Sequence, residues 1–408
     1  MDPCRRLPAS RTVGRAECLR LNPAIDPAGV TGGAIWHDYQ LESPERFALA
    51  LLGTAAGAAA ANYAPATAFL LRNGTIEGVR ARDLHADASF DVRARVVVNA
   101  AGPWAWSLLH TAGLARGRPA PVFSLAMNVV LGRAPLSHAV GGVAGGRFLF
   151  MVPWRDRSIV GTSHDPYTGA PDDLRVPADR LEAFLRDART AFPGAAIGAR
   201  SVRLVHRGLL PAAHAGRGDA LLKRSIVHDH RADGAHGLLT VVGVRYTTAR
   251  ATARAAAARV LQLLGLPDRA APAESPAVRG GDITDLAAYE RTEPARWPLP
   301  PHTVCRLIAA YGTRYTAVAE LAVARPQLAD PLSAECAVTG AEIHYAARHE
   351  MALHLSDALL RRTGAGAGGH PGAAAVARAA GIMAEALDWS AERTASEISA
   401  VNACYALE

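Results

Sequence analysis

Residues 237–264 read GLLTVVGVRYTTARATARAAAARVLQLL, and this stretch decides how the chain folds. Leu238–Val242 is a short apolar run with β-branched residues, which predicts a strand. Gly243 permits a tight turn, and Thr247 or Thr248 can cap the Ala-rich helix that we predict for the rest of the stretch. The amino end of such a helix offers N–H groups and partial positive charge to an anion or an electron-rich group. The alternative is an ordinary strand–helix connection that binds nothing.

The composition indicates a globular protein. Of 408 residues, 50% are hydrophobic and 20% are charged, which is enough for a substantial core and about two domains. The formal net charge of +7 comes almost entirely from arginine, since Lys223 is the only lysine. No arginine run with interleaved aromatic residues indicates a nucleic-acid-binding face. A mildly basic body favours phosphate-bearing substrates or an anionic membrane surface.

Cysteine usage and hydropathy predict a cytoplasmic location. The cysteines have neither zinc-site nor disulfide-framework spacing, so we expect reduced thiols. They are Cys4, Cys18, Cys305, Cys336 and Cys404. The amino-terminal MDPCRRLPAS lacks the apolar core of a signal peptide. No uninterrupted apolar stretch of about 18 residues occurs, so any membrane contact should be peripheral, at the inner face of the cell membrane.

The pattern of elements predicts three parts: residues 1–266 with mixed sheets, a Pro-, Ala- and Gly-rich linker at 267–301, and a helical domain at 302–408. The fold class is therefore α+β/α/β followed by an all-helical domain. In the first part, Asn73-Gly74 is a hairpin turn signal. The predicted strands there are Phe69–Leu71, Ile76–Arg82, Val92–Asn99, Asn128–Leu131, Arg147–Val152, Ser158–Thr162, Arg203–Val205 and Leu221–Val227. The predicted helices are Pro44–Ala61, Ala178–Ala191, Thr303–Tyr311, Thr316–Ala324, Ala341–Leu355, Pro371–Ala386 and Ala391–Val401.

A second informative stretch is RARVVVNAAGPW, which ends at Trp104. Ala100, Ala101 and Gly102 are small, so a bulky ligand can approach the backbone closely at the carboxyl end of a strand, where open α/β sheets bind cofactors. The alternative is a tight turn that needs small residues only for packing.

A third stretch is Phe150–Asp173, in which two strands are joined by a polar turn. The second strand ends at Gly161-Thr162-Ser163, followed by His164 and Asp165. These two side chains are candidates for proton transfer or for orienting a substrate hydroxyl. The alternative is that they are loop residues satisfied by the backbone.

The order of several short motifs along the chain is also informative. They are VVNAAGPW at Val97–Trp104, Pro153-Trp154 followed by Gly161-Thr162 and Tyr167, the turn Gly243–Thr248, Ala309–Arg314, Asp357–Thr363 and Ile382–Ser390. Together they resemble the FAD-dependent glycerol-3-phosphate dehydrogenase family, within the amino-acid-oxidase-like flavoproteins. The resemblance covers roughly residues 10–405.

The resemblance implies a FAD enzyme of glycerol metabolism that oxidises glycerol 3-phosphate to dihydroxyacetone phosphate and passes electrons to quinone. It implies that Arg245, where the family has lysine, keeps a cation beside flavin and substrate that stabilises an alkoxide. Arg224, in LLKRS, matches a substrate-binding arginine of the family. The cofactor-binding positions that it implies are Ala100, Ala101, Gly102, Trp104, Gly243, Val244, Tyr246, Thr247 and Thr248.

The chain departs from this family at its start. No strand–GxGxxG–helix unit for the FAD pyrophosphate precedes Val97, so we expect an incomplete FAD-binding domain that begins about a hundred residues into the family's fold. The GxGxxG match at Gly364, Gly366 and Gly369 follows a helical segment and precedes Pro371, so we expect it to be a loop between helices.

The chain also departs at the substrate positions. Leu210 stands where the family has a phosphate-binding arginine, and Asn128 where it has a histidine. Asparagine can hydrogen-bond a hydroxyl but cannot take its proton, so His206, His164 and His228 remain candidates for the base. Two alternatives follow: a related flavoprotein that oxidises another alcohol or an amine, and a non-catalytic remnant that keeps the scaffold.

Overall fold

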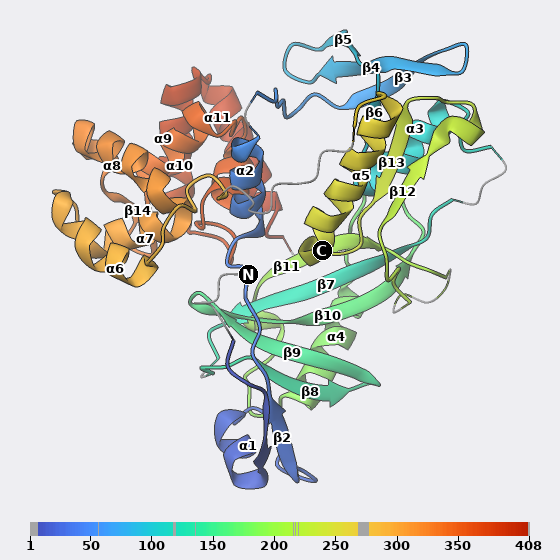
Figure 1. Cartoon of the computed structure of the whole chain (residues 1–408). Helices are drawn as coiled ribbons and strands as arrows, with labels where there is room; N and C mark the ends of the chain where they lie inside the picture. Colours follow the sequence, from blue (N-terminus) through green and yellow to red (C-terminus); the bar gives the residue numbers. More distant parts are fainter. Residues whose placement is uncertain are drawn as a thin grey trace.

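The structure is a computed structural model that describes residues 7–55, 57–116, 120–134, 136–214, 216, 218, 220–267 and 277–406. Cys4 and residues 268–276 of the predicted linker lie outside them. A five-stranded antiparallel sheet, a smaller sheet above it and a helical domain beside both make up most of the fold (Figure 1). No helix within the described ranges is both long and apolar enough to cross a lipid bilayer.

The five-stranded sheet has the order β11-β7-β10-β9-β8. Its strands are β7 (Phe123–Gly132), β8 (Val140–Ala144), β9 (Arg147–Trp154), β10 (Arg157–Tyr167) and β11 (Val202–Pro211). Alternate β7 residues Met127, Val129 and Leu131 are buried in one core with Phe184 and Leu185 of α4 (Ala178–Ala191), because successive side chains of a strand point to opposite faces. Helix α4 has the predicted bounds. It covers one face of the sheet and leaves Asn128 on the other.

The smaller sheet has the order β12-β13-β6, in which β13 (Leu238–Val242) runs parallel to β6 (Val97–Asn99) and antiparallel to β12 (Ile226–Asp229). Strand β13 is confirmed with its predicted bounds. It leads through a short turn into α5 (Ala249–Leu263), and β6 leads into α3 (Ala105–Thr111). The described part of the predicted FAD-binding domain is built around this sheet (Figure 1).

The predicted strand Val92–Asn99 is wrong, because the chain changes sheets within it. Its first residues belong to β5 (Ala88–Arg93), which pairs with β4 (Thr75–Asp83), and its last three form β6. Between them the Ala94 N–H donates to the Glu77 carbonyl, 3.0 Å away, so the ladder of β4 ends there. The hairpin of β3 (Ala66–Arg72) and β4 is confirmed.

The Asn73-Gly74 turn of that hairpin has φ values of 49° and 75°, as the predicted tight turn requires. A separate two-stranded sheet pairs β1 (Arg11–Gly14) with β2 (Gly32–Ile35). Helix α1 (Arg15–Leu21) lies between these strands in the sequence. The Asn22 amide that follows α1 donates to the Gly141 carbonyl of β8, 3.3 Å away.

The helical domain packs around fully buried side chains such as Leu307, Tyr315, Ile343 and Met383. Its elements are α6 (Leu286–Thr292), α7 (Pro301–Tyr311), α8 (Tyr315–Ala324), β14 (Pro331–Ser333), β15 (Cys336–Thr339), α9 (Gly340–His349), η9 (Asp357–Arg362), α10 (Ala373–Leu387) and α11 (Ala391–Ala403). The prediction missed the β14–β15 hairpin, so the domain is not entirely helical. Helix α6 lies inside the predicted linker, capped by the Asp285 carboxylate.

The predicted helix Ala341–Leu355 ends early, at His349. Met351 adopts φ 55°, a left-handed conformation that interrupts a right-handed helix. The chain then forms η9, a helix with the wider π-type turn. Four other predicted helices of this domain are confirmed within one or two residues: Thr303–Tyr311, Thr316–Ala324, Pro371–Ala386 and Ala391–Val401.

Helix α2 (Pro44–Thr54) packs against the helical domain although it comes from the first part of the chain (Figure 1). Ser43 caps it by accepting from the Arg46 N–H, and it ends at Thr54 instead of the predicted Ala61. The Arg46 guanidinium forms an ion pair of 2.6 Å with Glu350, in which both side chains are largely buried. Burial alone would lower the pKa of Arg46, but Glu350 raises it overall, so the pair stays charged.

We expect two glycine-to-alanine changes to alter the free energy of unfolding in opposite directions. Gly312 has φ +57°, and a Cβ there would lie 1.8 Å from the Gly280 carbonyl oxygen, so Gly312→Ala should cost about 3 kcal/mol through strain and collision. Gly381 is exposed inside α10 with open space at its Cβ position, so Gly381→Ala should add about 0.5–1 kcal/mol. Urea unfolding followed by circular dichroism measures both. Equal stability of the two variants would contradict the packing described.

Candidate functional site

Three chain segments meet at one edge of the small sheet, which we call the strand-end edge: 100–104, 224–225 and 243–248. Strand β6 pairs in parallel with β13, with Asn99 beside Thr240, so the turns after both strands leave the sheet at the same edge. Strand β12 is antiparallel, with Ile226 beside Val242, so the residues before it start from that edge too. Strand β11 of the large sheet contacts Gly102–Trp104.

Asn99 holds the first of these segments in place. Its buried side-chain amide donates to the Ala105 carbonyl at 3.0 Å and to the Thr240 hydroxyl at 3.4 Å, and its oxygen accepts from the Ala101 N–H at 3.4 Å. Gly102 then adopts φ +56°, and a Cβ there would meet nothing within 4 Å. Asn99 thus holds the turn through hydrogen bonds, and the space at the Gly102 Cβ position is open.

The second segment is open in the same way. A Cβ on Gly243 would also meet nothing within 4 Å, and Arg245, Tyr246 and Thr247 are exposed. Thr248 occupies the N-cap position of α5 without capping it through its side chain, because its hydroxyl donates to the Arg245 carbonyl, 3.1 Å away. The prediction of a threonine side-chain cap is therefore wrong. The Ala249 N–H, the first of α5, donates to the Tyr246 carbonyl, so this end of the helix offers an electron-rich group mainly the partial positive charge of the helix.

Neighbouring residues steady this turn. The Tyr246 hydroxyl donates to the Pro44 carbonyl, 2.9 Å away, and its ring lies 6.1 Å from that of Phe47, so α2 supports the turn from one side.

Arg224 and Arg245 are both exposed and belong to the strand-end edge. The predicted cofactor-binding residues and both predicted substrate-binding arginines thus share one location.

Asn128 and His206 lie on the large sheet, directly opposite each other on β7 and β11. The Asn128 side-chain oxygen accepts from the Thr162 hydroxyl at 2.8 Å. His206 Nε2 lies 3.3 Å from the Ala367 carbonyl oxygen, and its ring packs edge-on against Trp154. The imidazole of His206 is therefore directed toward the helical domain. Burial lowers its pKa, so it is neutral at pH 7.

The other polar candidates have local partners. Strand β10 continues to Tyr167, past the predicted end, so His164 and Asp165 are strand residues. His164 Nδ1 lies 3.3 Å from the Ser124 hydroxyl, and Asp165 forms an ion pair of 3.2 Å with Arg180. Leu210, on β11, is half-buried and lies opposite Ser124 of β7. His228 contacts Asp233, a residue that the sequence analysis did not single out.

A cavity of about 1480 Å³ lies between α2 and the helical domain. Arg46, Arg155, Arg306 and Gly364 are among its lining residues, and none of the predicted site residues lines it. Gly364 and Gly369 belong to a loop between η9 and α10, as predicted. The segments that form this cavity are far apart in the chain, so no local pattern indicates it.

The strand-end edge fits one side of a flavin ring. Two turns with open space at Gly102 and Gly243, a helix amino end without a side-chain cap and an adjacent arginine provide a close backbone approach and positive potential. These features are what a planar, electron-accepting ring requires of its surroundings.

Comparisons with known proteins identify the family and the fold. Residues 2–259 match the family model described as FAD dependent oxidoreductase, and residues 273–394 match the C-terminal domain of alpha-glycerophosphate oxidase. Glycerol-3-phosphate dehydrogenase of Mycobacterium leprae is 29% identical over 411 residues, covering 98% of this chain and 68% of the relative. The enzyme of that name from Synechocystis is 24% identical over 380 residues, covering 88% and 68%.

A solved structure shares the fold. Glycerol-3-phosphate dehydrogenase from Bacillus halodurans, complexed with FAD, matches with a TM-score of 0.79 and 23% identity, over 97% of this chain and 79% of that one. These findings confirm the family resemblance and the predicted fold class, an FAD-dependent oxidoreductase fold with mixed sheets and a C-terminal helical domain.

We expect acid to destabilise the protein partly through His206. The pKa of His206 is lowered from 6.5 by burial, so the unfolded chain takes up this proton first as the pH falls. Stability from this group is complete above about pH 6.5 and declines below it. The melting temperature should therefore fall less between about pH 7 and pH 5 in His206→Gln than in the wild type.

The control for this comparison is His236→Gln, which changes an exposed histidine. Its pH dependence should match that of the wild type. His344, whose pKa is also lowered by burial, leaves a residual slope in all variants. An unchanged slope in His206→Gln would contradict the burial of the imidazole.

Proposed function

We propose, because the chain belongs to the FAD dependent oxidoreductase family, that it oxidises the secondary alcohol of glycerol 3-phosphate to dihydroxyacetone phosphate and passes the electrons to quinone. The observation that carries this proposal is the convergence of the turns after β6 and β13 at one open sheet edge, beside two exposed arginines. The names of the relatives, glycerol-3-phosphate dehydrogenases from several bacteria, support the substrate.

FAD, when bound, would accept the hydride from the alcohol carbon. The turns at Ala100–Trp104 and Gly243–Thr248 would hold the ring, since a ligand can approach their backbones closely. The amino end of α5 and the charge of Arg245 would stabilise negative charge beside the ring and on the substrate oxygen. A guanidinium does not act as a base, so Arg245 would bind and orient only.

Arg224 would bind the substrate phosphate. It lies two residues before β12, at the end of that strand nearest Gly243. Its charge and that of Arg245 are therefore both at the strand-end edge. A guanidinium can make two parallel hydrogen bonds to a phosphate. An anionic substrate would therefore be held beside the ring by two fixed positive charges.

His206 and Asn128 would handle the hydroxyl proton. The Ala367 carbonyl can only accept, so His206 Nε2 carries the hydrogen and Nδ1 carries a lone pair that can take a proton. The low pKa keeps the imidazole in this neutral, proton-accepting form. Asn128, opposite it, can hydrogen-bond the hydroxyl through its NH₂ group, since its oxygen accepts from Thr162.

A second candidate function is the oxidation of another alcohol or an amine by the same fold. Leu210 favours it, because an apolar side chain stands at the position where the resemblance predicts a phosphate-binding arginine. We keep glycerol 3-phosphate as the main proposal because Arg224 and Arg245 supply two cations at the strand-end edge.

We expect the purified chain, supplied with FAD under anaerobic conditions, to lose its visible flavin absorption when glycerol 3-phosphate is added. A quinone analogue should restore the absorption. Bleaching by another alcohol or an amine, but not by glycerol 3-phosphate, would favour the second candidate. A chain that does not bind FAD, or a bound flavin that no substrate reduces, would contradict the proposed function.

We expect the two arginines to differ in their kinetic effects. Arg224→Gln should raise KM about 10- to 100-fold with little change in kcat, because phosphate binding is the same in the ground and transition states. Arg245→Gln should lower kcat by about 100-fold, since its charge matters most when the alkoxide forms, and Arg245→Lys should restore much of that loss. Steady-state kinetics on both variants measure this. Arg254→Gln, an exposed position farther along α5, is the control and should behave as wild type.

A further inference from the structure

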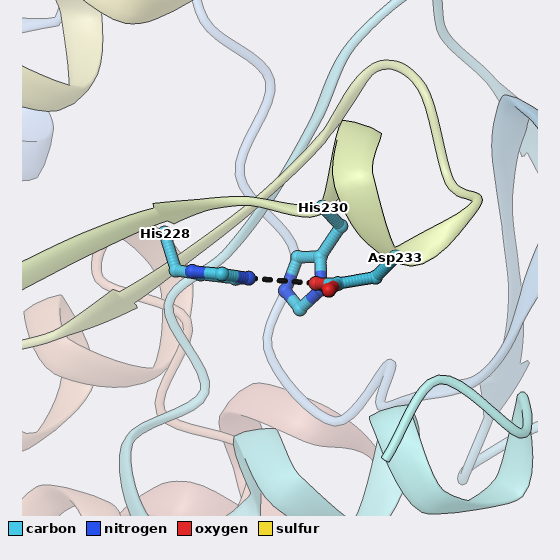
Figure 2. A group of neighbouring side chains, drawn as sticks. All are labelled: His228, His230 and Asp233. Atoms are coloured by element: carbon cyan, nitrogen blue, oxygen red, sulfur yellow. Dashed lines mark hydrogen bonds and ion pairs between the residues drawn. The ribbon is translucent and has the colours of Figure 1, made fainter. Parts of the chain in front are cut away.

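A compact cluster of histidine and aspartate side chains lies where β12 ends. His228 is on β12, and His230 and Asp233 are on the short helix η4 (His230–Asp233) that follows it. His228 Nε2 lies 2.6 Å from Asp233 Oδ2, and His230 Nδ1 lies 2.8 Å from the same oxygen. Figure 2 shows the three side chains pointing toward one another.

The local fold builds this arrangement. The Asp229 carboxylate accepts from the Arg231 N–H at 2.9 Å and so caps η4. Gly234 ends η4 in a left-handed conformation at φ 83°, which turns the chain back toward β13. This turn brings the Asp233 carboxylate into contact with both imidazoles, although Asp233 follows His228 by five residues.

The cluster has the burial gradient of a binding site. The His230 side chain is 1% exposed, that of Asp233 13% and that of His228 38%. Two of the three groups are therefore withdrawn from solvent, and the third closes the cluster from the outside. His228 is therefore the member of the cluster that an ion from solvent meets first.

The donor set fits a divalent cation of the zinc class. Two imidazole nitrogens and one carboxylate oxygen are ligands that Zn²⁺ prefers, and three protein ligands with water in the fourth position is a common arrangement. All three ligand atoms lie within 4.8 Å of one another. Bonds of about 2.1 Å in a tetrahedral site require separations of roughly 3.4 Å, so the contacts to Asp233 would open by less than about 1 Å.

A second contact supports metal ligation by His230. Its Nε2 lies 2.8 Å from the hydroxyl oxygen of buried Thr240. Histidine ligands usually donate their other ring N–H to such an oxygen, which fixes the ring and places a lone pair on the nitrogen that binds the ion. With this tautomer, a lone pair on Nδ1 faces the Asp233 carboxylate, and a cation between the two is favourable.

We propose that His228, His230 and Asp233 bind one divalent transition-metal ion of the zinc class, and that the ion stabilises the strand-end edge. The connection is direct, because Thr240 also accepts from Asn99, which holds the turn after β6. The site does not depend on the proposed function, since its ligands and its link to Asn99 are independent of flavin or substrate.

Calorimetric titration of the full chain with Zn²⁺ tests the proposal. We expect one ion per chain, and a loss of affinity by more than about 100-fold in His228→Gln and in Asp233→Asn. His228 is partly exposed, so His228→Gln should fold. His236→Gln, an exposed histidine three residues beyond Asp233, is the matched control and should bind as the wild type does. No binding by the wild type, or unchanged binding in either ligand variant, would overturn the proposal.

Two further measurements distinguish this site from other residues. Co²⁺ should give a visible d–d absorption without a thiolate charge-transfer band, because no cysteine belongs to the donor set; a thiolate band would assign the ion to a cysteine and overturn the proposal. Thr240→Val should weaken Zn²⁺ binding about 10- to 100-fold, whereas Thr240→Ser keeps the hydroxyl and should retain it. Equal affinities in the two threonine variants would contradict the role of Thr240.

Discussion

The parallel pairing of β6 with β13 is the constraint on which the candidate site depends. Strand β6 has only three residues, so few ladder hydrogen bonds hold it. Asn99, at its end, compensates, because its buried amide reaches Ala105, Ala101 and Thr240. A buried amide without partners would cost about 1–3 kcal/mol, so these contacts select one conformation of the turn. Because both strands run in the same direction, their two open turns must leave the sheet together.

The sequence predicted elements well where the local signal and the tertiary packing agree. Helix Ala178–Ala191 and strand Leu238–Val242 have the predicted bounds, since each has a clear apolar pattern along its whole length and stays within one layer of the fold. The stretch Val92–Asn99 has equally good strand residues throughout, but its two halves pair with different sheets. Local periodicity carries no information about pairing partners, so it could not place this break. The same limit applies to the early end of α9 at His349, which a left-handed Met351 decides.

For the site, the sequence identified segments but not the directions of side chains. The two turns were found because small residues after apolar runs have a local signature. The orientation of His206 depends on Ala367, 161 residues away, and on Trp154, so no motif indicates it. The histidine and aspartate cluster has an HxHxxD spacing in the sequence. Its convergence requires the turn that Gly234 closes, which the spacing alone does not specify.

Thr240 connects the two sites physically. Its hydroxyl has one proton and two lone pairs, and both the Asn99 amide and His230 Nε2 approach it. Without an ion, either the Thr240 hydroxyl donates to His230 Nε2 or a hydrogen on Nε2 is donated to the hydroxyl oxygen, so two hydrogen-bond arrangements compete. A metal on Nδ1 requires the hydrogen on Nε2, so Thr240 then accepts from both neighbours. Metal binding would therefore select one arrangement of the whole chain of contacts from Asp233 to the turn after β6.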